Sequence, residues 1–470
     1  MLSIKNSIGG GNEIPKISNL VTIKREKDNF TISYKITDIE LSICRQYISL
    51  KTSNNVIFNK KEITKDVGYE SENNIFTFNI NGLSRDTAYT VEIFASDGID
   101  EGKSEALQVS TTNPNIYELN INENNANSFT SVTYGGDATG FTPAEGTNLG
   151  DWENKWPFNQ IRIVGFKDGK VTKEIKKDNK KQYVDGNSVN EDVDVMVEIP
   201  RIYYKFTTQT NGYKITISDE TIKDGACFAH RRGTKENDYI YIGAYLGSKD
   251  SEGNLRSLPD KNMINSDQIP VSKMKPGYEK EYFYLWNLKH ILFMLAYKCR
   301  NGQLVLGKSS TSSYRNTGVL ADKGYIYGSE KTRKQFLGIE DFYGLNSTIV
   351  YGIWCRDAIV RICKNNANLK DINSYAQVGK LFYQNTHTPG FFNKMQATNV
   401  LQFLPKLASL NIQGTDTNHY GATFYPPATG YYFEWFHNND GNRATDETGM
   451  FEMGFTQDER EPTRLCYLGV

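Results

Sequence analysis

The stretch that decides the fold class runs from Asp192 to Ser218 and reads DVDVMVEIPRIYYKFTTQTNGYKITIS. Val, Ile and Tyr dominate both halves, and these residues favour strands. The pair Asn211-Gly212 separates the halves, and this pair suits a type I′ turn because both central residues of that turn take positive φ. We therefore expect a β-hairpin with Asn211 and Gly212 at its tip.

The composition extends the β prediction to the whole chain. The 29 Tyr and 24 Phe residues suit strands, and the many Asn and Gly residues suit turns. At 470 residues the chain exceeds one ordinary domain, so two or three domains are expected. The 54 Lys and Arg balance 55 Asp and Glu, which argues against nucleic-acid binding because that function needs a basic surface. We expect a mainly β protein with some α structure.

Several segments in the later part of the chain resemble one protein family in sequence. The run Asp194–Lys205 (DVMVEIPRIYYK) resembles phage tail and tail-fibre proteins that carry a C-type lectin-like domain. Further segments resemble the same family in the same order, namely Trp156–Arg162, Asp238–Ser248, Ala296–Gln303, Leu337–Gly344 and Arg464–Tyr467. After Gly344 the chain departs from the Gly-Asn-Val-x-Glu-Trp continuation of the family and of its oxidase relatives. The resemblance implies a C-type lectin-like α+β receptor-binding domain with insertions over 128–470.

The first part of the chain alternates short predicted strands with turns. Phe30–Ile36 and Ile75–Ile80 alternate apolar and polar residues, as half-buried strands do. The Leu83-x-x-x-Thr87-x-Tyr89 spacing resembles fibronectin type III domains, in which the Tyr hydroxyl bonds back to upstream backbone. A different seven-strand sandwich remains open. We expect an arm or docking segment at 1–14, a fibronectin type III-like β-sandwich at 15–112 and a linker at 113–127.

Two local patterns in the large domain predict particular elements. Asp168-Gly169 between apolar runs predicts a second hairpin. The segment Tyr282–Cys299 carries apolar residues at helical spacing, which predicts a helix with one apolar stripe against the core. Arg300-Asn301-Gly302 then supplies the charge and turn residue expected at the end of that helix.

The search for catalytic and metal motifs favours a non-enzymatic protein without a cofactor. The six cysteines form no Cys-x-x-Cys pair, so buried thiols are expected. The five histidines lack metal-site spacing, and neither a nucleophile elbow nor a phosphate-binding loop occurs. Calcium stays open but unsupported: the oxygen-rich segment 438–447 could supply ligands, yet Glu461-Pro462-Thr463 follows Trp435, the reverse of the lectin motif order.

Two C-terminal segments are the binding candidates. The first mixes aromatic anchors with adaptable polar groups, a combination that suits recognition surfaces. Its candidate residues are Trp435, His437, Asn438, Asn439, Asp440, Asn442 and Arg443. The second is a charged segment between two predicted strands, with candidate residues Asp458, Glu459 and Arg460.

The resemblance implies a tail-fibre or baseplate protein of a phage or a phage-tail-like bacteriocin (a tailocin). Its C-terminal loops would bind a bacterial surface glycan or protein, and its N-terminal region would bind other tail proteins, commonly in a homotrimer. No signal peptide is visible and the apolar run Ile291–Tyr297 is too short to span a bilayer, so we expect synthesis in the host cytoplasm without membrane insertion. The alternatives are a tail-associated glycan depolymerase using Asp440, Asp446, Glu447, Asp458 or Glu459, and a purely structural tail component.

Overall fold

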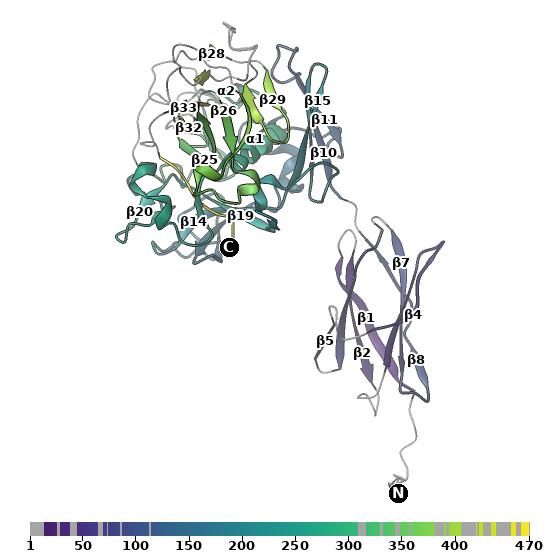
Figure 1. The fold of residues 1–470 in the computed structure, drawn as a ribbon. Helices are drawn as coiled ribbons and strands as arrows, with labels where there is room; N and C mark the ends of the chain where they lie inside the picture. The colour runs from purple at the N-terminus through teal and green to yellow at the C-terminus, as the bar shows by residue number, and fades with distance from the viewer. Residues whose placement is uncertain are drawn as a thin grey trace. The chain divides into compact units, whose positions relative to one another are not determined.

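The computed structural model divides the chain into two compact units, Met1–Pro114 and Asn115–Val470. The protein is mainly β (Figure 1). The described residues are 14–25, 29–37, 45–63, 69–72, 74–84, 87–111, 114–308, 316–329, 332–343, 348–356, 359–380, 390–391, 394–405, 420, 423–425, 434–438, 453–456 and 462–469.

The described strands of the first unit form two antiparallel sheets. One sheet has the order β1-β2-β6-β5, and the other has the order β4-β3-β7-β8 with β9 also paired to β7. The strands are β1 (Lys16–Arg25), β2 (Phe30–Thr37), β3 (Arg45–Lys51), β4 (Val56–Glu62), β5 (Tyr69–Glu72), β6 (Ile75–Ile80), β7 (Ala88–Ser96), β8 (Glu101–Lys103) and β9 (Leu107–Ser110).

Alternation along these strands builds the core of the first unit. Phe30, Ile32, Tyr34 and Ile36 all point inward from β2, and the residues between them are only partly buried. They join one apolar cluster with side chains of β3, β6, β7 and β9, so the two sheets pack face to face. The strands predicted at Phe30–Ile36 and Ile75–Ile80 are confirmed.

The turn before β7 is held by a tyrosine side chain. The Tyr89 hydroxyl accepts a hydrogen bond from the Ser84 N–H at 2.8 Å and donates to the Ser84 carbonyl oxygen at 3.3 Å. The ring itself is 1% exposed and packs in the core. The bond back to upstream backbone that the Leu83–Tyr89 spacing predicts is therefore present.

The second unit contains three larger sheets within the described residues. Their orders are β11-β10-β16-β15, β13-β12-β14-β19-β34-β22 and β27-β26-β25-β32-β33-β31-β28. Their strands are β10 (Ile116–Asn122), β11 (Val132–Gly136), β12 (Arg162–Lys167), β13 (Lys170–Ile175), β14 (Asp194–Pro200), β15 (Tyr203–Gln209), β16 (Gly212–Ser218), β19 (Tyr239–Gly243), β22 (Tyr278–Lys280), β25 (Thr348–Arg356), β26 (Ile359–Ile362), β27 (Ala376–Lys380), β28 (Gly390–Phe391), β31 (Thr423–Tyr425), β32 (Glu434–Asn438), β33 (Met453–Thr456) and β34 (Leu465–Tyr467).

Short ribbons and helices complete the described part of this unit. The ribbons pair β17 (Arg231–Arg232) with β18 (Lys235–Glu236), β20 (Ser248–Lys249) with β21 (Leu255–Arg256), β23 (Gln335–Phe336) with β24 (Ile339–Glu340), and β29 (Met395–Ala397) with β30 (Gln402–Pro405). The helices are α1 (Phe283–Tyr297), α2 (Gln303–Leu306), and the 3-10 turns η2 (Gly150–Asn154), η3 (Phe228–His230), η4 (Ser266–Gln268), η5 (Val271–Lys273), η6 (Lys364–Asn366) and η7 (Ile372–Ser374).

Helix α1 lies at the centre of the main core of the second unit. All of its residues are buried, including Asn287 and Lys289, so the prediction of a single apolar stripe is wrong. A helix enclosed on every side has no polar face to show. It also ends earlier than expected, because Lys298 takes the left-handed conformation and its N–H bonds to the Met294 carbonyl oxygen at 2.9 Å. Arg300 is buried and donates to the Asn125 carbonyl oxygen instead of capping the helix in solvent.

The opening stretch forms the expected hairpin only in its second half. Strand β15 pairs with β16, but β14 belongs to the other sheet, between β12 and β19. Every residue of β14 is buried, as in a central strand, whereas the far end of β15 is exposed. The tip is also displaced, because Gln209 pairs with Gly212 and leaves Thr210 and Asn211 in the turn. By contrast, Asp168-Gly169 forms the predicted two-residue turn with positive φ at both positions.

The segment expected as a linker, 113–127, contains a strand. In β10 the side chains of Tyr117, Leu119 and Ile121 are buried, and the strand pairs with β11 on one side and β16 on the other. The Asn-rich composition hid this alternation, because the Asn residues occupy the outward positions and the ends. The docking arm was expected at 1–14, and residues 1–13 of it lie outside the described residues.

Strand β34 completes the sheet that contains β14. Tyr241 of β19 and Tyr278 of β22 both pair with Tyr467, so β34 lies between two strands from much earlier in the chain. Its side chains Leu465 and Cys466 are buried. No described helix is long and apolar enough to cross a membrane.

Candidate functional site

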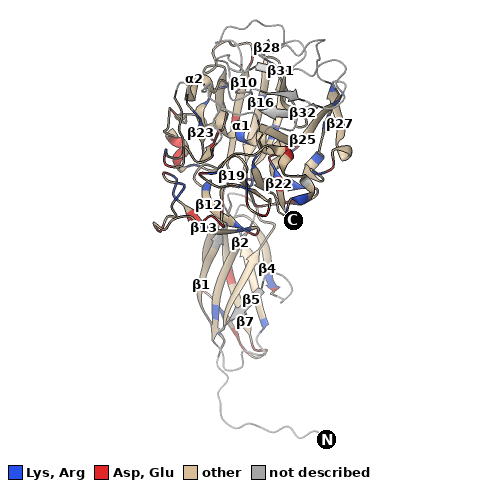
Figure 2. Ribbon diagram, turned by 90° about the vertical axis from the view of Figure 1, so that its left-hand side faces the viewer, with Lys and Arg blue, Asp and Glu red and all other residues tan. Residues whose placement is uncertain are grey.

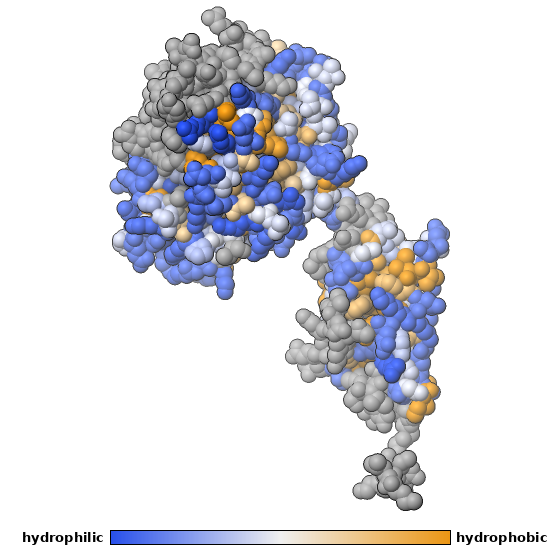
Figure 3. Space-filling view, viewed as in Figure 1, coloured by the Kyte–Doolittle hydropathy of each residue, from blue (hydrophilic) through white to orange (hydrophobic). Residues whose placement is uncertain are grey.

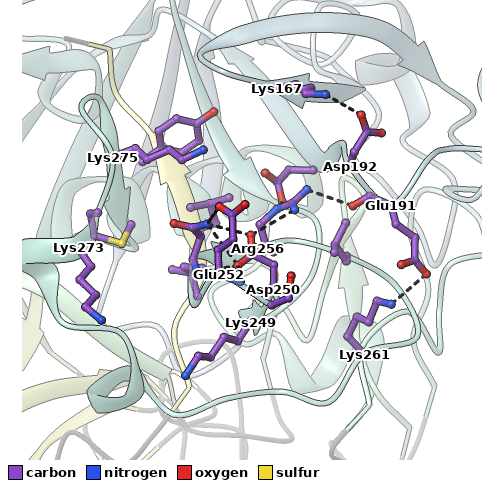
Figure 4. Close-up of a pocket in the computed structure, with 18 of the residues that line it drawn as sticks. Lys167, Glu191, Asp192, Lys249, Asp250, Glu252, Arg256, Lys261, Lys273 and Lys275 are labelled. Carbon is purple, nitrogen blue, oxygen red and sulfur yellow. Dashed lines mark hydrogen bonds and ion pairs between the residues drawn. The ribbon is translucent and has the colours of Figure 1, made fainter.

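A charged groove of about 700 Å³ opens on the second unit (Figure 4). Six segments wall it: the β12–β13 turn, the chain leading into β14, the β20–β21 ribbon, the segment 258–261, the segment 273–278 and β34. Its charged lining residues are Lys167, Asp168, Glu191, Asp192, Asp194, Lys249, Asp250, Glu252, Arg256, Lys261, Lys273 and Lys275.

The β20–β21 ribbon forms one wall because its turn is built around a single carboxylate. Asp250 Oδ1 accepts hydrogen bonds from the N–H of Glu252 at 3.0 Å and of Asn254 at 2.8 Å. Gly253 has φ +87, a conformation that L-residues rarely adopt. Burial acts to raise the pKa of Asp250, but hydrogen bonds from Asn254 and Glu252 and the charge of Arg256 lower it overall. The turn thus holds an ionised carboxylate.

Arg256 anchors the floor of the groove. Its Nε donates to Asp194 Oδ1 at 2.9 Å, and its Nη1 lies 3.6 Å from Asp250 Oδ2. Asp194 also accepts the Ser257 N–H at 2.8 Å. Burial raises the pKa of the Asp194 carboxyl, while Arg256 and the Ser257 N–H act in the opposite direction. The two carboxylates therefore meet at one guanidinium, which fixes their positions.

The rim of the groove carries exposed charges of both signs. Lys167 pairs with Asp192 at 2.6 Å, and Lys261 pairs with Glu191 at 2.9 Å. Such exposed pairs contribute little stability, so a ligand can replace either partner at small cost. Lys249 and Lys273 are exposed and make no ion pair with any described residue. This arrangement suits a hydrated, polar or charged ligand better than an apolar one.

The surface around the groove is also polar. In the ribbon of Figure 2, described cationic and anionic residues are interspersed over the second unit. On the face seen in Figure 3 the described surface of this unit is predominantly hydrophilic. A group of hydrophobic residues is also visible on that face, beside the atoms drawn in grey.

Most of the sequence-predicted site residues lie outside the described part of the chain. These are Asn439, Asp440, Asn442, Arg443, Asp458, Glu459 and Arg460, together with Asp446 and Glu447 of the depolymerase alternative. The backbone of Trp435, His437 and Asn438 lies in β32, which pairs with β25 and β33. Trp435 pairs with Trp354 of β25 on one side and with Thr456 of β33 on the other. The three described candidates of β32 therefore lie in a strand that has a neighbour on both sides.

The groove residues were not among the sequence candidates. Asp250-Ser251-Glu252-Gly253-Asn254 is a turn signal, because Asp, Gly and Asn favour turns, but nothing in it distinguishes a binding wall from any exposed loop. Asp194 and Arg256 are 62 positions apart, and their contact needs the tertiary fold.

Within the described residues, no group of three or more His, Cys, Asp or Glu side chains could hold a metal ion. The five described cysteines, Cys227, Cys299, Cys355, Cys363 and Cys466, are buried thiols. No protein-family model matches the chain, and a comparison with curated proteins finds no match.

Proposed function

We propose that this chain is a receptor-binding protein of a phage tail or tailocin, a tail-fibre or baseplate component, and that its recognition of the receptor is non-enzymatic. In this proposal the first unit is a fibronectin type III-like spacer. Its division into β1-β2-β6-β5 and β4-β3-β7-β8 sheets supports that assignment, as does the Tyr89–Ser84 hydrogen bond. A spacer needs a stable sandwich and no reactive site.

The second unit would be a C-type lectin-like recognition domain. The support is the late strand β34, which joins a sheet formed mostly by strands from the start of the unit. When the last strand pairs with early strands, much of the chain between them can form long loops. Loops on a rigid scaffold are frequent sites of recognition.

The observation that carries the proposal is the charged groove with exposed, replaceable charges on its rim. β34 forms part of its wall through Leu465. The candidate residues Asp458, Glu459 and Arg460 precede the described chain, which resumes at Pro462, by only a few positions in the sequence. We propose that the groove and the two C-terminal candidate segments together bind a bacterial surface glycan or surface protein. A homotrimer would multiply such contacts, and the N-terminal region would bind other tail proteins.

Competition for host adsorption tests this function. Purified full-length protein should block attachment of the parent particle to host cells. Lys249→Ala with Lys273→Ala removes two exposed groove cations that make no ion pair with described residues. Trp435→Ala with Arg443→Ala changes the first candidate segment. We expect at least one of these double variants to bind cells more than about tenfold more weakly, because central interface residues cost about 2 kcal/mol or more when truncated.

The matched control is Lys51→Ala, an exposed lysine at the end of β3 in the first unit. It removes the same kind of charge far from both candidate segments in the sequence, and adsorption should not change. If wild-type protein binds no host and does not compete with the particle, the receptor-binding proposal is rejected.

One observation keeps the depolymerase as a second candidate. Asp194 and Asp250 share Arg256, and their pKa values are moved in opposite directions, upward for Asp194 by burial and downward for Asp250. Paired carboxyl groups with separated pKa values are what glycosidases use. Sustained release of reducing sugar from purified envelope, lost in Asp250→Asn, would favour this function over binding alone.

A further inference from the structure

A second, smaller pocket of about 240 Å³ lies elsewhere in the second unit. Its walls include the apolar side chains Ile269, Leu369 and Ile372. Three polar side chains from separate elements also line it: Ser266 of η4, Lys280 of β22 and Tyr351 of β25. These three, named here the Ser–Lys–Tyr triad, are 1%, 3% and 5% exposed. The remaining lining residues are Asp267, Pro270, Ser272, Lys370 and Tyr375, so the pocket combines apolar walls with polar and charged groups.

The triad is a closed triangle of hydrogen-bond distances. Lys280 Nζ lies 2.9 Å from Ser266 Oγ and 2.8 Å from Tyr351 Oη, and the two hydroxyl oxygens are 2.9 Å apart. Lys280 Nζ also donates to the Ser266 carbonyl oxygen at 2.8 Å. The carbonyl contact fixes the amine beside the serine hydroxyl. A nucleophile within hydrogen-bond reach of a base that a third group orients is the arrangement of nucleophilic catalysis.

The same triangle is fully satisfied with a neutral lysine. In that state Ser266 donates to the amine, the amine donates to Tyr351 and to the Ser266 carbonyl, and Tyr351 donates to Ser266 Oγ. Each oxygen and the nitrogen has a partner, and the serine proton already points at the lone pair that would accept it. Ser266 can therefore lose its proton without any rearrangement of the three side chains.

We propose that the Ser–Lys–Tyr triad is a nucleophilic serine site that hydrolyses esters with a short acyl group. Ser266 Oγ bonds to the acyl carbon while its proton passes to the Lys280 amine. The ester C–O bond breaks, and the departing alkoxide takes that proton. Water then adds to the acyl carbon and gives a proton to Lys280. Ser266 Oγ leaves the acyl group and recovers this proton.

The pocket sets the substrate class and the role of the tyrosine. Its volume is below the 300–1,000 Å³ typical of drug-sized ligands, so a short acyl chain fits and a long one does not. Ile269 and Leu369 offer apolar contacts to that chain. Tyr351 acts as a positioning residue, because its hydroxyl bridges the amine and the serine. This activity concerns a different pocket from the charged groove and does not depend on host adsorption.

A fluorophosphonate probe tests the nucleophile directly, because it bonds to an activated serine with loss of fluoride. The full chain is incubated with the probe and mapped by peptide mass spectrometry, and hydrolysis of p-nitrophenyl butyrate and palmitate is followed in parallel. We expect labelling at Ser266 and hydrolysis of the butyrate ester only.

Four variants separate the roles. Ser266→Ala should abolish both labelling and hydrolysis. Lys280→Arg should lower hydrolysis at least a hundredfold, because a guanidinium stays protonated and cannot accept the serine proton. Tyr351→Phe should lower it about tenfold and shift the pH profile. Ser257→Ala is the control, since Ser257 is equally buried but donates to the Val195 carbonyl oxygen at 2.8 Å. Tryptophan fluorescence checks that each variant is folded. An unlabelled Ser266 in folded wild-type protein, or full hydrolysis by Ser266→Ala, would overturn the proposal.

Discussion

His230 lies in η3 with no exposed surface, and its Nε2 is 3.4 Å from the Ile199 carbonyl oxygen. Burial lowers its pKa from 6.5 to about 3, because the charged imidazolium loses its hydration there. The folded state thus holds His230 neutral, while the unfolded chain takes up a proton below about pH 6.5. The resulting stability is present above that pH and is lost as pH falls toward 3.

We predict that the free energy of unfolding of the second unit falls between pH 7.5 and 5, and that His230→Gln reduces this slope. The wild-type slope from one such group approaches about 1.4 kcal/mol per pH unit. Urea unfolding followed by tryptophan fluorescence measures it, because all five tryptophans lie beyond residue 114. Equal slopes in the two proteins would show that His230 is not the group responsible.

Tyr89 gives a residue-scale prediction for the first unit. Tyr89→Phe removes the hydroxyl that bonds both backbone atoms of Ser84, and a lost hydrogen bond of this kind costs about 1 kcal/mol. Amide hydrogen exchange of β7 should therefore become several-fold faster. Tyr47→Phe is the control, since Tyr47 is a half-buried tyrosine in the neighbouring strand β3. Unchanged exchange in Tyr89→Phe would contradict a stabilising role.

At the scale of elements, the sequence predicted correctly those features that depend only on residues adjacent in the chain. The Asp168-Gly169 turn was predictable because two residues determine it. The placement of β14 and β15 in different sheets was not predictable, because the residues near Pro200 do not indicate which sheet each strand joins. The triad of Ser266, Lys280 and Tyr351 was equally hidden, because three distant segments supply it. The charged groove depends on the same kind of long-range contact.

Gly212 gives an element-scale prediction. A Cβ at Gly212 would lie 2.0 Å from the Ile121 carbonyl oxygen of the neighbouring strand β10. Gly212→Ala should therefore lower the free energy of unfolding of the second unit by more than about 2 kcal/mol. The matched control is Gly140→Ala, where φ is +85 and no atom lies within 4 Å of the added Cβ. That variant should cost only the backbone strain, about 1 kcal/mol. Similar losses in both would show that the close approach to β10 is unimportant.

At the scale of the whole molecule, β34 makes the second unit depend on a short segment. Ending the chain after Arg464 would remove Leu465, Cys466 and Leu468, all buried, and would expose edges on β19 and β22. Each buried apolar side chain contributes about 1.5–3 kcal/mol, against a typical total of 5–15 kcal/mol. We predict that this truncation abolishes the cooperative fluorescence transition of the second unit. The first unit should keep its hydrogen-exchange protection.

The control for the truncation ends the chain after Leu468, which keeps β34 and removes only the last two residues of the sequence. Its transition should stay within a few degrees of the wild type. A cooperative transition in the shorter protein would show that β19 and β22 hold the sheet together without β34.

The position of β34 also constrains how the protein is made. Arg464, at the entry to β34, donates to the Gly243 carbonyl oxygen, 221 positions earlier in the chain. During synthesis the edge of β19 that pairs with β34 therefore stays unpaired until the ribosome has made the whole intervening sequence. The first unit can fold in that interval, because its contacts are complete by residue 111. Long-range pairing slows folding and leaves strand edges open to other chains. Yield in a recombinant host should thus depend on chaperones and on growth temperature.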